Sequence, residues 1–481
     1  MTDTVIVRFE GDGSGVAELS WGQHEIWCVI RDKNDFLPIG GVRALPPGQT
    51  VADVAAGLRF IMSRHQSLRT RLRLAAGGLP KQVVHARGEI ALEVVDAGDG
   101  DPAATAAAVA GRYMARNFDH GQEWPVRMAA ITRHGAATHV AEIYCHLAVD
   151  GFGLAALRED LARHDRTGPV PAPVTATQPL EQASQQRGPA GRRADDASMR
   201  YFERLAASVP GRQLSELADK QRPRFWQATY ESPAGYLASR ILAARLGVGT
   251  SPVLLAAYAV ALSALTASRS VAVQLVVNNR FRPGFGGSVS TVAQSSPCLI
   301  ETGTARFEEL CVRVWRSALT AYKHGYYDPV SKDTVSRRIA AERGSPLDLG
   351  LFFNDRRVRS RQLADAAPED AATQGESPSL RARLARSTLT WGERTDTPAD
   401  KVFLYLNDTP DTLCYELWAD THFVSPADMV ALMRRIEATL VGAAFGDYLG
   451  DTGLVGDRAL VGDTGEGEGG SVAVPAMDAA R

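Results

Sequence analysis

The chain has 481 residues, of which 45% are hydrophobic and 22% are charged, and its formal net charge is -2. A balance this close to neutral gives no reason to expect nucleic acid or an anionic membrane as the main partner. The length allows roughly two to four domains, each large enough to bury its own core.

The N-terminal residues "MTDTVIVRFEGDGSG" contain neither a basic region nor a long apolar run, so we predict no secretion signal. The cysteines form no CxxC pair, and unpaired cysteines in apolar surroundings suit a reducing compartment. We therefore expect a cytoplasmic protein whose cysteines are buried thiols: Cys28, Cys145, Cys298, Cys311 and Cys414.

The first part of the chain mixes strands and helices. Alternating apolar residues at 5–9 predict a strand, and residues 19–27 and 51–72 are predicted as helices. An apolar strand over 139–144 stops at a histidine, and the Asp-Gly turn signal after it leads into a helix over 152–164. A side chain at such a strand end is held firmly yet faces open space, which is a common place for chemistry.

The second part begins with a predicted helix over 199–207. Residues 251–267 form the most apolar stretch, but it is shorter than the ~20 residues that a membrane span needs. We predict a buried core helix capped by Thr250 or Ser251. The unbroken apolar run over 270–279 predicts a strand that is covered on both faces.

Composition divides the chain into four parts. Residues 166–198 are rich in Pro, Gln and Ala without periodicity, which predicts a linker between subdomains at 1–165 and 199–450. The tail over 451–481 is rich in Gly and Asp and has too few apolar residues to form a core, so we predict disorder. A polar stretch over 358–387 is predicted as a surface loop.

The stretch "CHLAVDGFG", residues 145–153, carries a histidine, an aspartate and a glycine in the spacing HxxxDG. It resembles the HHxxxDGxS signature of condensation domains of nonribosomal peptide synthetases. The shorter HxxxDG is shared by the wider superfamily of chloramphenicol-acetyltransferase-like acyltransferases. His146, Asp150 and Gly151 satisfy that shorter pattern.

Further stretches resemble the same family in the same order along the chain. Residues 19–27, "LSWGQHEIW", are similar to its SxAQxRLW motif, and residues 64–72, "RHQSLRTRL", to RHExLRTxF, which is the most specific match. Residues 117–131 resemble the segment that precedes the histidine motif, and residues 276–299 resemble the stretch that ends in IGxFVNTLPLR. The resemblance covers about residues 15–445.

The sequence departs from the family pattern at several positions. Cys145 stands where the first histidine of HH is expected, Gly153 replaces the serine of DGxS, and Glu25 replaces the arginine of the first motif. Ser290 and Gln294 replace the glycine and the asparagine of the late stretch, and no segment matches the family's DFGxG motif.

The resemblance implies an α/β fold of two chloramphenicol-acetyltransferase-like subdomains, arranged as a V-shaped pseudo-dimer with a central channel. It implies acyl transfer from a phosphopantetheine thioester on an acyl or peptidyl carrier protein to an amine, in natural-product biosynthesis. No cofactor of its own is expected, because the thioester already carries the activation. Since no carrier or adenylation segment is visible, we expect a free-standing enzyme that meets the carrier in trans.

Two other functions stay open at the level of the sequence. One is an O-acyltransferase that makes esters on an alcohol acceptor, since a single histidine suffices in related enzymes. The other is a catalytically silent platform that binds carrier proteins, which the replacements at Cys145 and Gly153 make more plausible.

His146 is the expected catalytic residue. An ordinary imidazole titrates near ~6.5 and an α-amine near ~8, so the ring can take a proton from an amine as it bonds to a carbonyl carbon. The alternative is that His146 is a core histidine whose ring nitrogens form hydrogen bonds with the backbone. The ordered set of motifs favours the catalytic role.

Asp150 and Gly151 are expected to be structural. The resemblance implies that Asp150 pairs with an arginine of the second half, and Arg280 stands at the matching place; a buried aspartate needs such a partner. The alternative for Asp150 is a solvated turn residue that caps the following helix. Gly151 is expected to supply a backbone shape that a side chain would block.

Four further residues are candidates for lining the channel: Cys145, Gly153, Ser295 and Ser296. Cys145 and His146 should point to opposite faces of a strand, which argues against a thiolate–imidazole pair and for a small buried thiol. A cysteine beside a histidine, with no second ligand pair, also lacks the spacing of a zinc site, so no metal is expected.

Overall fold

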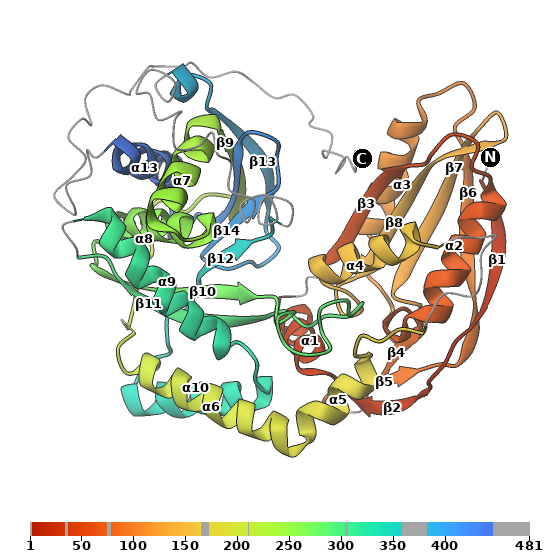
Figure 1. Ribbon diagram of the computed structural model, residues 1–481, viewed down its shortest axis with the longest axis horizontal. Coiled ribbons are helices and arrows are strands. Elements are labelled where there is room, and N and C mark those ends of the chain that lie inside the picture. Colours follow the sequence, from red (N-terminus) through yellow and green to blue (C-terminus); the bar gives the residue numbers. More distant parts are fainter. Residues whose placement is uncertain are drawn as a thin grey trace. The chain divides into compact units, whose positions relative to one another are not determined.

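The computed structural model describes residues 2–33, 37–74, 78–164, 173–209, 211–303, 306–357 and 382–445. The chain divides into two compact units (Figure 1). Of the described residues, the first unit contains those up to Ala194 together with Asn278–Gln294, and the second contains Asp195–Val277 and those from Ser295 to 445. The late segment Asn278–Gln294 thus belongs to the first unit, which the predicted boundaries do not anticipate.

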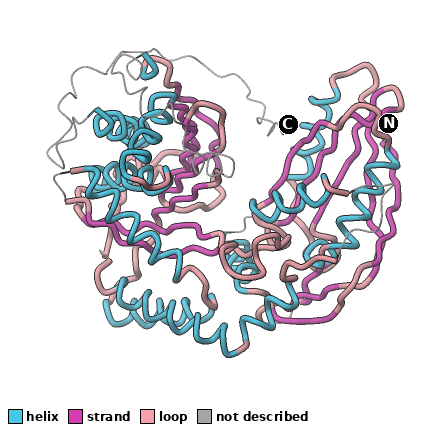
Figure 2. Tube along the Cα trace, viewed as in Figure 1, coloured by secondary structure: helices cyan, strands magenta, loops and turns pink. Residues whose placement is uncertain are grey.

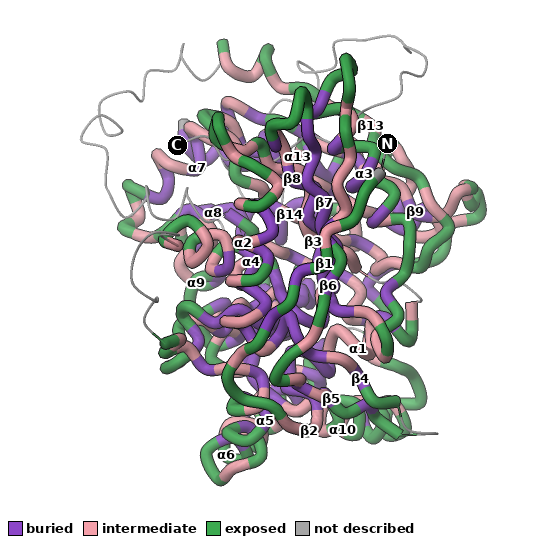
Figure 3. The backbone as a smooth tube through the Cα atoms, turned by 90° about the vertical axis from the view of Figure 1, so that its right-hand side faces the viewer, coloured by how far each residue is buried: buried purple, intermediate pink, exposed green. Residues whose placement is uncertain are grey.

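The first unit is built on a five-stranded sheet. β6 and β7 run parallel and the other neighbours antiparallel. β7 is buried at every residue but its last, because helices cover both faces of the sheet, and the central strands stand out as buried in Figure 3. The strand order is β1 (Thr2–Glu10), β6 (Arg87–Asp96), β7 (Val126–Arg133), β8 (Ala136–Cys145) and β3 (Pro38–Ala44) (Figure 2).

Helices cover this sheet on both sides. One hydrophobic cluster packs α2 (Val51–Arg64) and α4 (Gly151–Ala162) against the sheet, and a second cluster packs α3 (Pro102–Met114) against the opposite face. The strand and the helix predicted around the HxxxDG motif are therefore confirmed as β8 and α4.

The predicted helix over 51–72 is too long. α2 ends at Arg64, residues 66–69 form a short 3-10 turn, and β4 (Thr70–Arg73) continues as a strand. β4 pairs with β5 (Lys81–Val84), which also pairs with β2 (Gly15–Glu18), so pairing in this small sheet overrides the helical pattern of the sequence.

Arg64, His65 and Arg69 of the "RHQSLRTRL" stretch make contacts within the first unit. Arg64 Nε and His65 Nε2 lie 2.6 Å and 3.0 Å from the carboxylate of Asp160 in α4. Arg69 is 0% exposed and its guanidinium donates to backbone carbonyl oxygens, including that of Gly13 at 2.6 Å. The two guanidinium groups help to hold the helices and loops of the first unit together, because each buried guanidinium needs acceptors.

The predicted linker over 166–198 is only partly correct. Its second half forms α5 (Pro179–Arg187) and the start of α6 (Pro189–Ala206), and the boundary between the units falls inside α6. Gln182 of α5 is fully buried and donates to the hydroxyls of Ser288 at 3.0 Å and Ser290 at 2.6 Å. Hydrogen bonds from polar side chains contribute to docking this helix, and its sequence therefore resembles a linker.

The second unit has a seven-stranded sheet and helices packed around a larger hydrophobic core. Its strands follow the order β11 (Gln294–Glu301), β10 (Ser270–Val277), β12 (Leu351–Asp355), β14 (Val402–Asn407), β15 (Leu413–Asp420), β9 (Phe225–Ser232) and β13 (Thr388–Thr395). Its helices are α7 (Pro233–Leu246), α8 (Thr250–Thr266), α9 (Phe307–Lys323), α10 (Pro329–Arg343) and α13 (Pro426–Phe445).

The predicted core helix is α8, and it is buried as expected. The predicted cap is wrong: the helix begins at Thr250, and its N-cap is Gly249, which offers no side-chain cap. Among the described residues, no single helix has the length and hydropathy of a membrane span. The consecutive helices α7 and α8 have that length and hydropathy only when they are taken together, and this pair is bent by 114°.

Two predictions lie outside the described residues. One is the tail over 451–481, and the other is the predicted surface loop, of which residues 358–381 are not described. The V-shaped arrangement of the two units, with its central channel, stays a prediction.

Candidate active site

His146 is the first residue after β8, at the start of a turn that leads to α4. Tyr144 and Cys145 pack in the two clusters on opposite faces of the sheet, as the alternation of a strand requires. From Cys145 to Asp150 every residue is buried except His146, which is half-buried. The turn therefore presents the imidazole from an otherwise buried stretch.

Asp150 is 2% exposed and is engaged by Arg280, as the resemblance implies. The Arg280 Nη1 atom lies 3.0 Å from Asp150 Oδ2, and Nη2 lies 2.8 Å from Oδ1. The backbone N–H groups of Val292 and Ala293 each donate to Oδ2 at 3.0 Å. The two carboxylate oxygens are thus used in fixed contacts with the guanidinium and the backbone, which is a structural role.

The alternative predicted for Asp150 is correct only in part, because Asp150 caps the following helix but is buried and not solvated. Asp150 is the N-cap of α4, and its Oδ1 accepts from Gly153 N at 2.7 Å. One side chain thus starts the helix and fixes the segment Asn278–Gln294 against it. Arg280 completes the link, since its Nη2 also donates to the carbonyl oxygens of Ser288 at 3.1 Å and Ser290 at 3.2 Å.

The structure corrects the role predicted for Gly151. A Cβ atom at this position would meet nothing within 4 Å, so no contact excludes a side chain there. Gly153 is the constrained glycine instead: its Cβ would lie 2.8 Å from Ser290 O and 3.0 Å from Arg280 Nη2. Gly153 is buried against the segment that Asp150 fixes, and its place in a channel stays a prediction.

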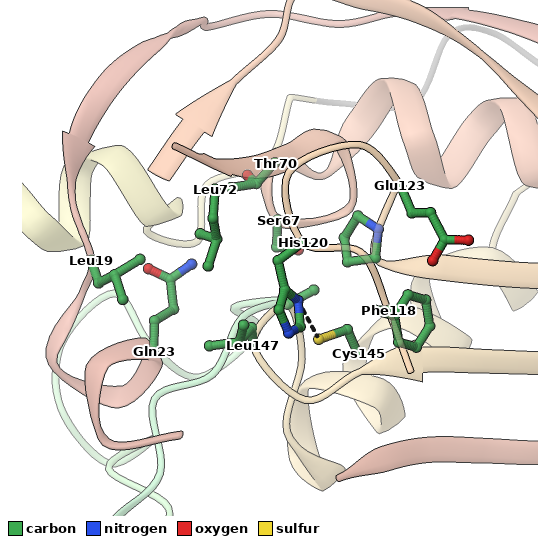
Figure 4. Close-up of a pocket in the computed structure, with 12 residues that line it drawn as sticks. Leu19, Gln23, Ser67, Thr70, Leu72, Phe118, His120, Glu123, Cys145 and Leu147 are labelled. Carbon is green, nitrogen blue, oxygen red and sulfur yellow. Dashed lines mark hydrogen bonds between the residues drawn. The ribbon is translucent and has the colours of Figure 1, made fainter. Parts of the chain in front are cut away.

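Cys145 is a buried thiol, in agreement with the prediction. It is 1% exposed, and burial raises the pKa of its thiol to about 12, so it is not a thiolate at neutral pH. Its sulfur lies 3.8 Å from Nδ1 of His120, toward which it points in Figure 4. The contact of this thiol is with His120 and not with the neighbouring His146.

Cys145 and His120 line a cavity of about 20 Å³ inside the first unit, together with Gln23 and Leu147 (Figure 4). Such a volume holds about one water molecule, whereas ligand pockets usually measure about 300–1,000 Å³. Cys145 thus lines a small pocket within the first unit, and its place in a channel stays a prediction. The one hint of His120 in the sequence is that residues 117–131 resemble a family segment.

Ser295 and Ser296 lie in β11 of the second unit. Ser296 is fully buried, and the backbone carbonyl oxygen of Ser295 accepts from the hydroxyl of Tyr327 at 2.6 Å. Their place in a channel stays a prediction. Across the residues with described positions, no group of three or more side chains is arranged to hold a metal ion.

Comparison with known proteins gives the same family that the motifs suggest. A family model for the condensation domain matches residues 48–331, a span that includes His146, Asp150 and Arg280. The probable non-canonical nonribosomal peptide synthetase CymA of Salinispora arenicola is 28% identical over 331 residues. These residues are 64% of this chain but only 4% of that relative, so the chain spans a small part of its length.

Solved structures share the fold. The condensation domain from the monacolin K polyketide synthase MokA has a TM-score of 0.70 and 15% identity, covering 92% of this chain and 100% of that one. The epimerization domain from the third module of tyrocidine synthetase B has a TM-score of 0.67 and 13% identity, covering 91% and 99%. The predicted α/β fold with two acetyltransferase-like subdomains is confirmed, and one fold serves more than one reaction.

Proposed function

Because the chain belongs to the condensation domain family, we propose that it transfers an acyl or aminoacyl group from a phosphopantetheine thioester to an amine. The phosphopantetheine arm is part of the substrate and is carried by a partner carrier protein. His146 handles the proton of the attacking amine. The product is an amide, made in the course of natural-product biosynthesis.

The observation that carries this proposal is the division of roles within the motif. Asp150 is saturated by Arg280 and by backbone N–H groups, and Cys145 is buried with a raised pKa. His146 is the titratable residue of the motif that keeps access to solvent. A general base must reach the substrate, and His146 meets that condition where its neighbours do not.

The proposed step balances with the groups at hand. The amine nitrogen bonds to the thioester carbon while the imidazole of His146 takes the proton that the nitrogen releases. The carbon–sulfur bond then breaks, and the imidazolium of His146 gives the proton to the leaving phosphopantetheine sulfur, which restores the neutral imidazole. The thioester supplies the activation, so the step uses no further cofactor.

The kind of partner follows from the relatives. CymA is named a nonribosomal peptide synthetase and MokA a polyketide synthase. Both names fit a substrate that is presented on a carrier. We further propose that the carrier is on a separate chain, as the sequence predicts. Turnover of an acyl group on a separately supplied carrier protein tests this.

The proposal is tested by intact-mass assays of the purified chain. One panel of acyl groups is offered on a phosphopantetheinylated carrier protein, on coenzyme A and as N-acetylcysteamine thioesters, each with amine and alcohol acceptors. We expect amide formation that is fastest from the carrier-bound donor. Equal turnover from coenzyme A at equal concentration would remove the carrier protein from the mechanism.

Two outcomes would assign the alternatives. Ester formation with alcohols, in the absence of amide formation, would make the chain an O-acyltransferase. Carrier binding without turnover of any donor would make it a silent platform. The buried thiol at Cys145, in place of the first motif histidine, is the feature that keeps the platform in consideration.

A further inference from the structure

Both ends of the HxxxD stretch are attached to one short segment that lies far along the chain. This segment comprises residues 288–293. Asp150, at the end of the stretch, accepts from the N–H groups of Val292 and Ala293 of this segment. At the start of the stretch, the hydroxyl of Thr291 donates to the backbone carbonyl oxygen of His146.

Thr291 is held rigidly itself. It is fully buried, and its β-branched side chain has restricted rotamers. Asn279 Nδ2 donates to the carbonyl oxygen of the next residue, Val292, at 3.0 Å. On the other side the backbone of α1 (Trp21–Lys33) approaches so closely that a Cβ on Gly22 would lie 2.3 Å from Thr291 O. The hydroxyl therefore has a fixed position from which to hold the turn.

We propose that Thr291 is a positioning residue for His146, acting through the backbone of the turn rather than by contact with substrate. The inference rests on the proposed function, since it assumes that the imidazole is the group that must be placed. In the family pattern this position is the unspecified residue of IGxFVNTLPLR, so the motif assigns it no role.

The position of the His146 imidazole depends on the backbone of the turn. His146 follows the last residue of β8, so the sheet no longer fixes its backbone, and the turn begins there. A hydrogen bond to its carbonyl oxygen sets the peptide plane that follows and limits the movement of the imidazole. Displacing a reacting group by about 1 Å costs about 10²-fold in rate, so a loosened turn is expected to show in turnover.

The variants are Thr291→Val, which keeps the shape and removes the hydroxyl, and Thr291→Ser, which keeps the hydroxyl. Thr302→Val is the matched control. Thr302 is also fully buried, and its hydroxyl also donates to a backbone carbonyl oxygen, that of Arg269 at 3.0 Å, in the second unit. Both valine variants are expected to lose some stability.

With a carrier-bound acyl group and an amine as substrates, kcat of Thr291→Val is expected to fall about tenfold with little change in KM. Thr291→Ser should recover most of the loss, and Thr302→Val should have wild-type turnover. In a His146→Ala background, Thr291→Val should cause no further loss. Equal turnover of Thr291→Val and Thr302→Val would overturn the proposal while leaving the role of His146 intact.

A second readout needs no substrate. In protein labelled with [13C]histidine, the His146 resonance is assigned by its loss in His146→Ala. We expect Thr291→Val to change the shift and the linewidth of this resonance, Thr291→Ser to restore them and Thr302→Val to leave them unaltered. An unchanged His146 resonance in Thr291→Val would overturn the proposal. If instead the resonance responds but His146→Ala turns over like the wild type, the proposed function fails and the positioning contact stands.

Discussion

Asp150 and Arg280 lie 130 positions apart in the sequence and form a buried ion pair within the first unit. Each carboxylate oxygen faces one terminal nitrogen of the guanidinium, which is the two-pronged geometry that favours Arg over Lys. The pair fixes the segment that carries Thr291 against the turn that carries His146. The candidate catalytic residue thus depends on a contact that bridges distant parts of the chain.

Asp150→Ala and Arg280→Ala are each expected to destabilise the protein by about 3–5 kcal/mol, because each strands a buried charge. The aspartate variant should be the worse one, since it also removes the acceptor of the Val292 and Ala293 N–H groups. The double variant should cost less than the sum of both. Denaturant unfolding of all four proteins measures this coupling, and additive losses would mean that the pair does not interact.

Gly153→Ala is expected to cost about 1–3 kcal/mol, because its Cβ would press on the carbonyl oxygen of Ser290. Gly153→Ser, which restores the family's residue, should be no better. Gly151→Ala is the matched control: it stands at the start of α4 in open space and should be neutral or slightly stabilising. Urea midpoints of the three variants provide the comparison, and equal midpoints for the two alanine variants would refute the steric argument.

The sequence allowed the HxxxD turn and its flanking strand and helix to be predicted from turn signals and apolar periodicity, and the Asp150–Arg280 pair to be predicted from the family resemblance. It did not reveal the constraint on Gly153, which is imposed by the backbone of Ser290, a neighbour only in the folded chain. The same holds for the hydroxyl of Thr291, whose partner is a backbone carbonyl oxygen.

Hydrophobic periodicity also does not predict the docking of α5, for a different physical reason. Gln178, Gln182 and Gln186 recur every four residues and so share one helix face. Gln178 Oε1 accepts from Gln66 N at 3.1 Å, and Gln186 Oε1 accepts from Trp21 N at 2.9 Å. A search for hydrophobic periodicity does not register a stripe of amides, so the segment was predicted as a linker. A polar stripe at helical spacing is the signal to look for.

Stability is expected to fall as the pH drops below about 6.5. Burial lowers the pKa of His65 and of His120 from the ordinary value of 6.5. Below that pH the unfolded chain therefore binds protons that the folded chain does not, and the free energy of unfolding decreases, by up to about 1.4 kcal/mol per pH unit for each group.

Denaturant unfolding between pH 7.5 and about 5.5 measures this slope, above the range in which carboxylates such as Asp160 titrate. His65→Gln should have a shallower slope than the wild type, whatever its stability at neutral pH. His134→Asn, at an exposed turn, is the control and should keep the wild-type slope. An unaltered slope in His65→Gln would contradict the effect of burial.

Cys145 should react slowly with thiol reagents in the folded protein. With a pKa of about 12, only about one thiol in 10⁴ is ionised at pH 8, and the thiolate is the reactive form. Peptide mapping after timed iodoacetamide labelling should show Cys145 modified far more slowly than the half-buried Cys28. Equal labelling rates would mean that the thiol is accessible. Cys145→Ala should correspondingly have only a mild effect on turnover.

The most direct test of the account is the turnover of His146→Ala, measured beside its carrier affinity and beside His139→Ala, which changes a histidine of β8, the strand that precedes His146. If His146 takes the amine proton, turnover should fall by about 10²–10⁴-fold while carrier binding and folding stay near wild type. His139→Ala should retain activity. Wild-type turnover in His146→Ala would contradict the assignment of His146 as the base.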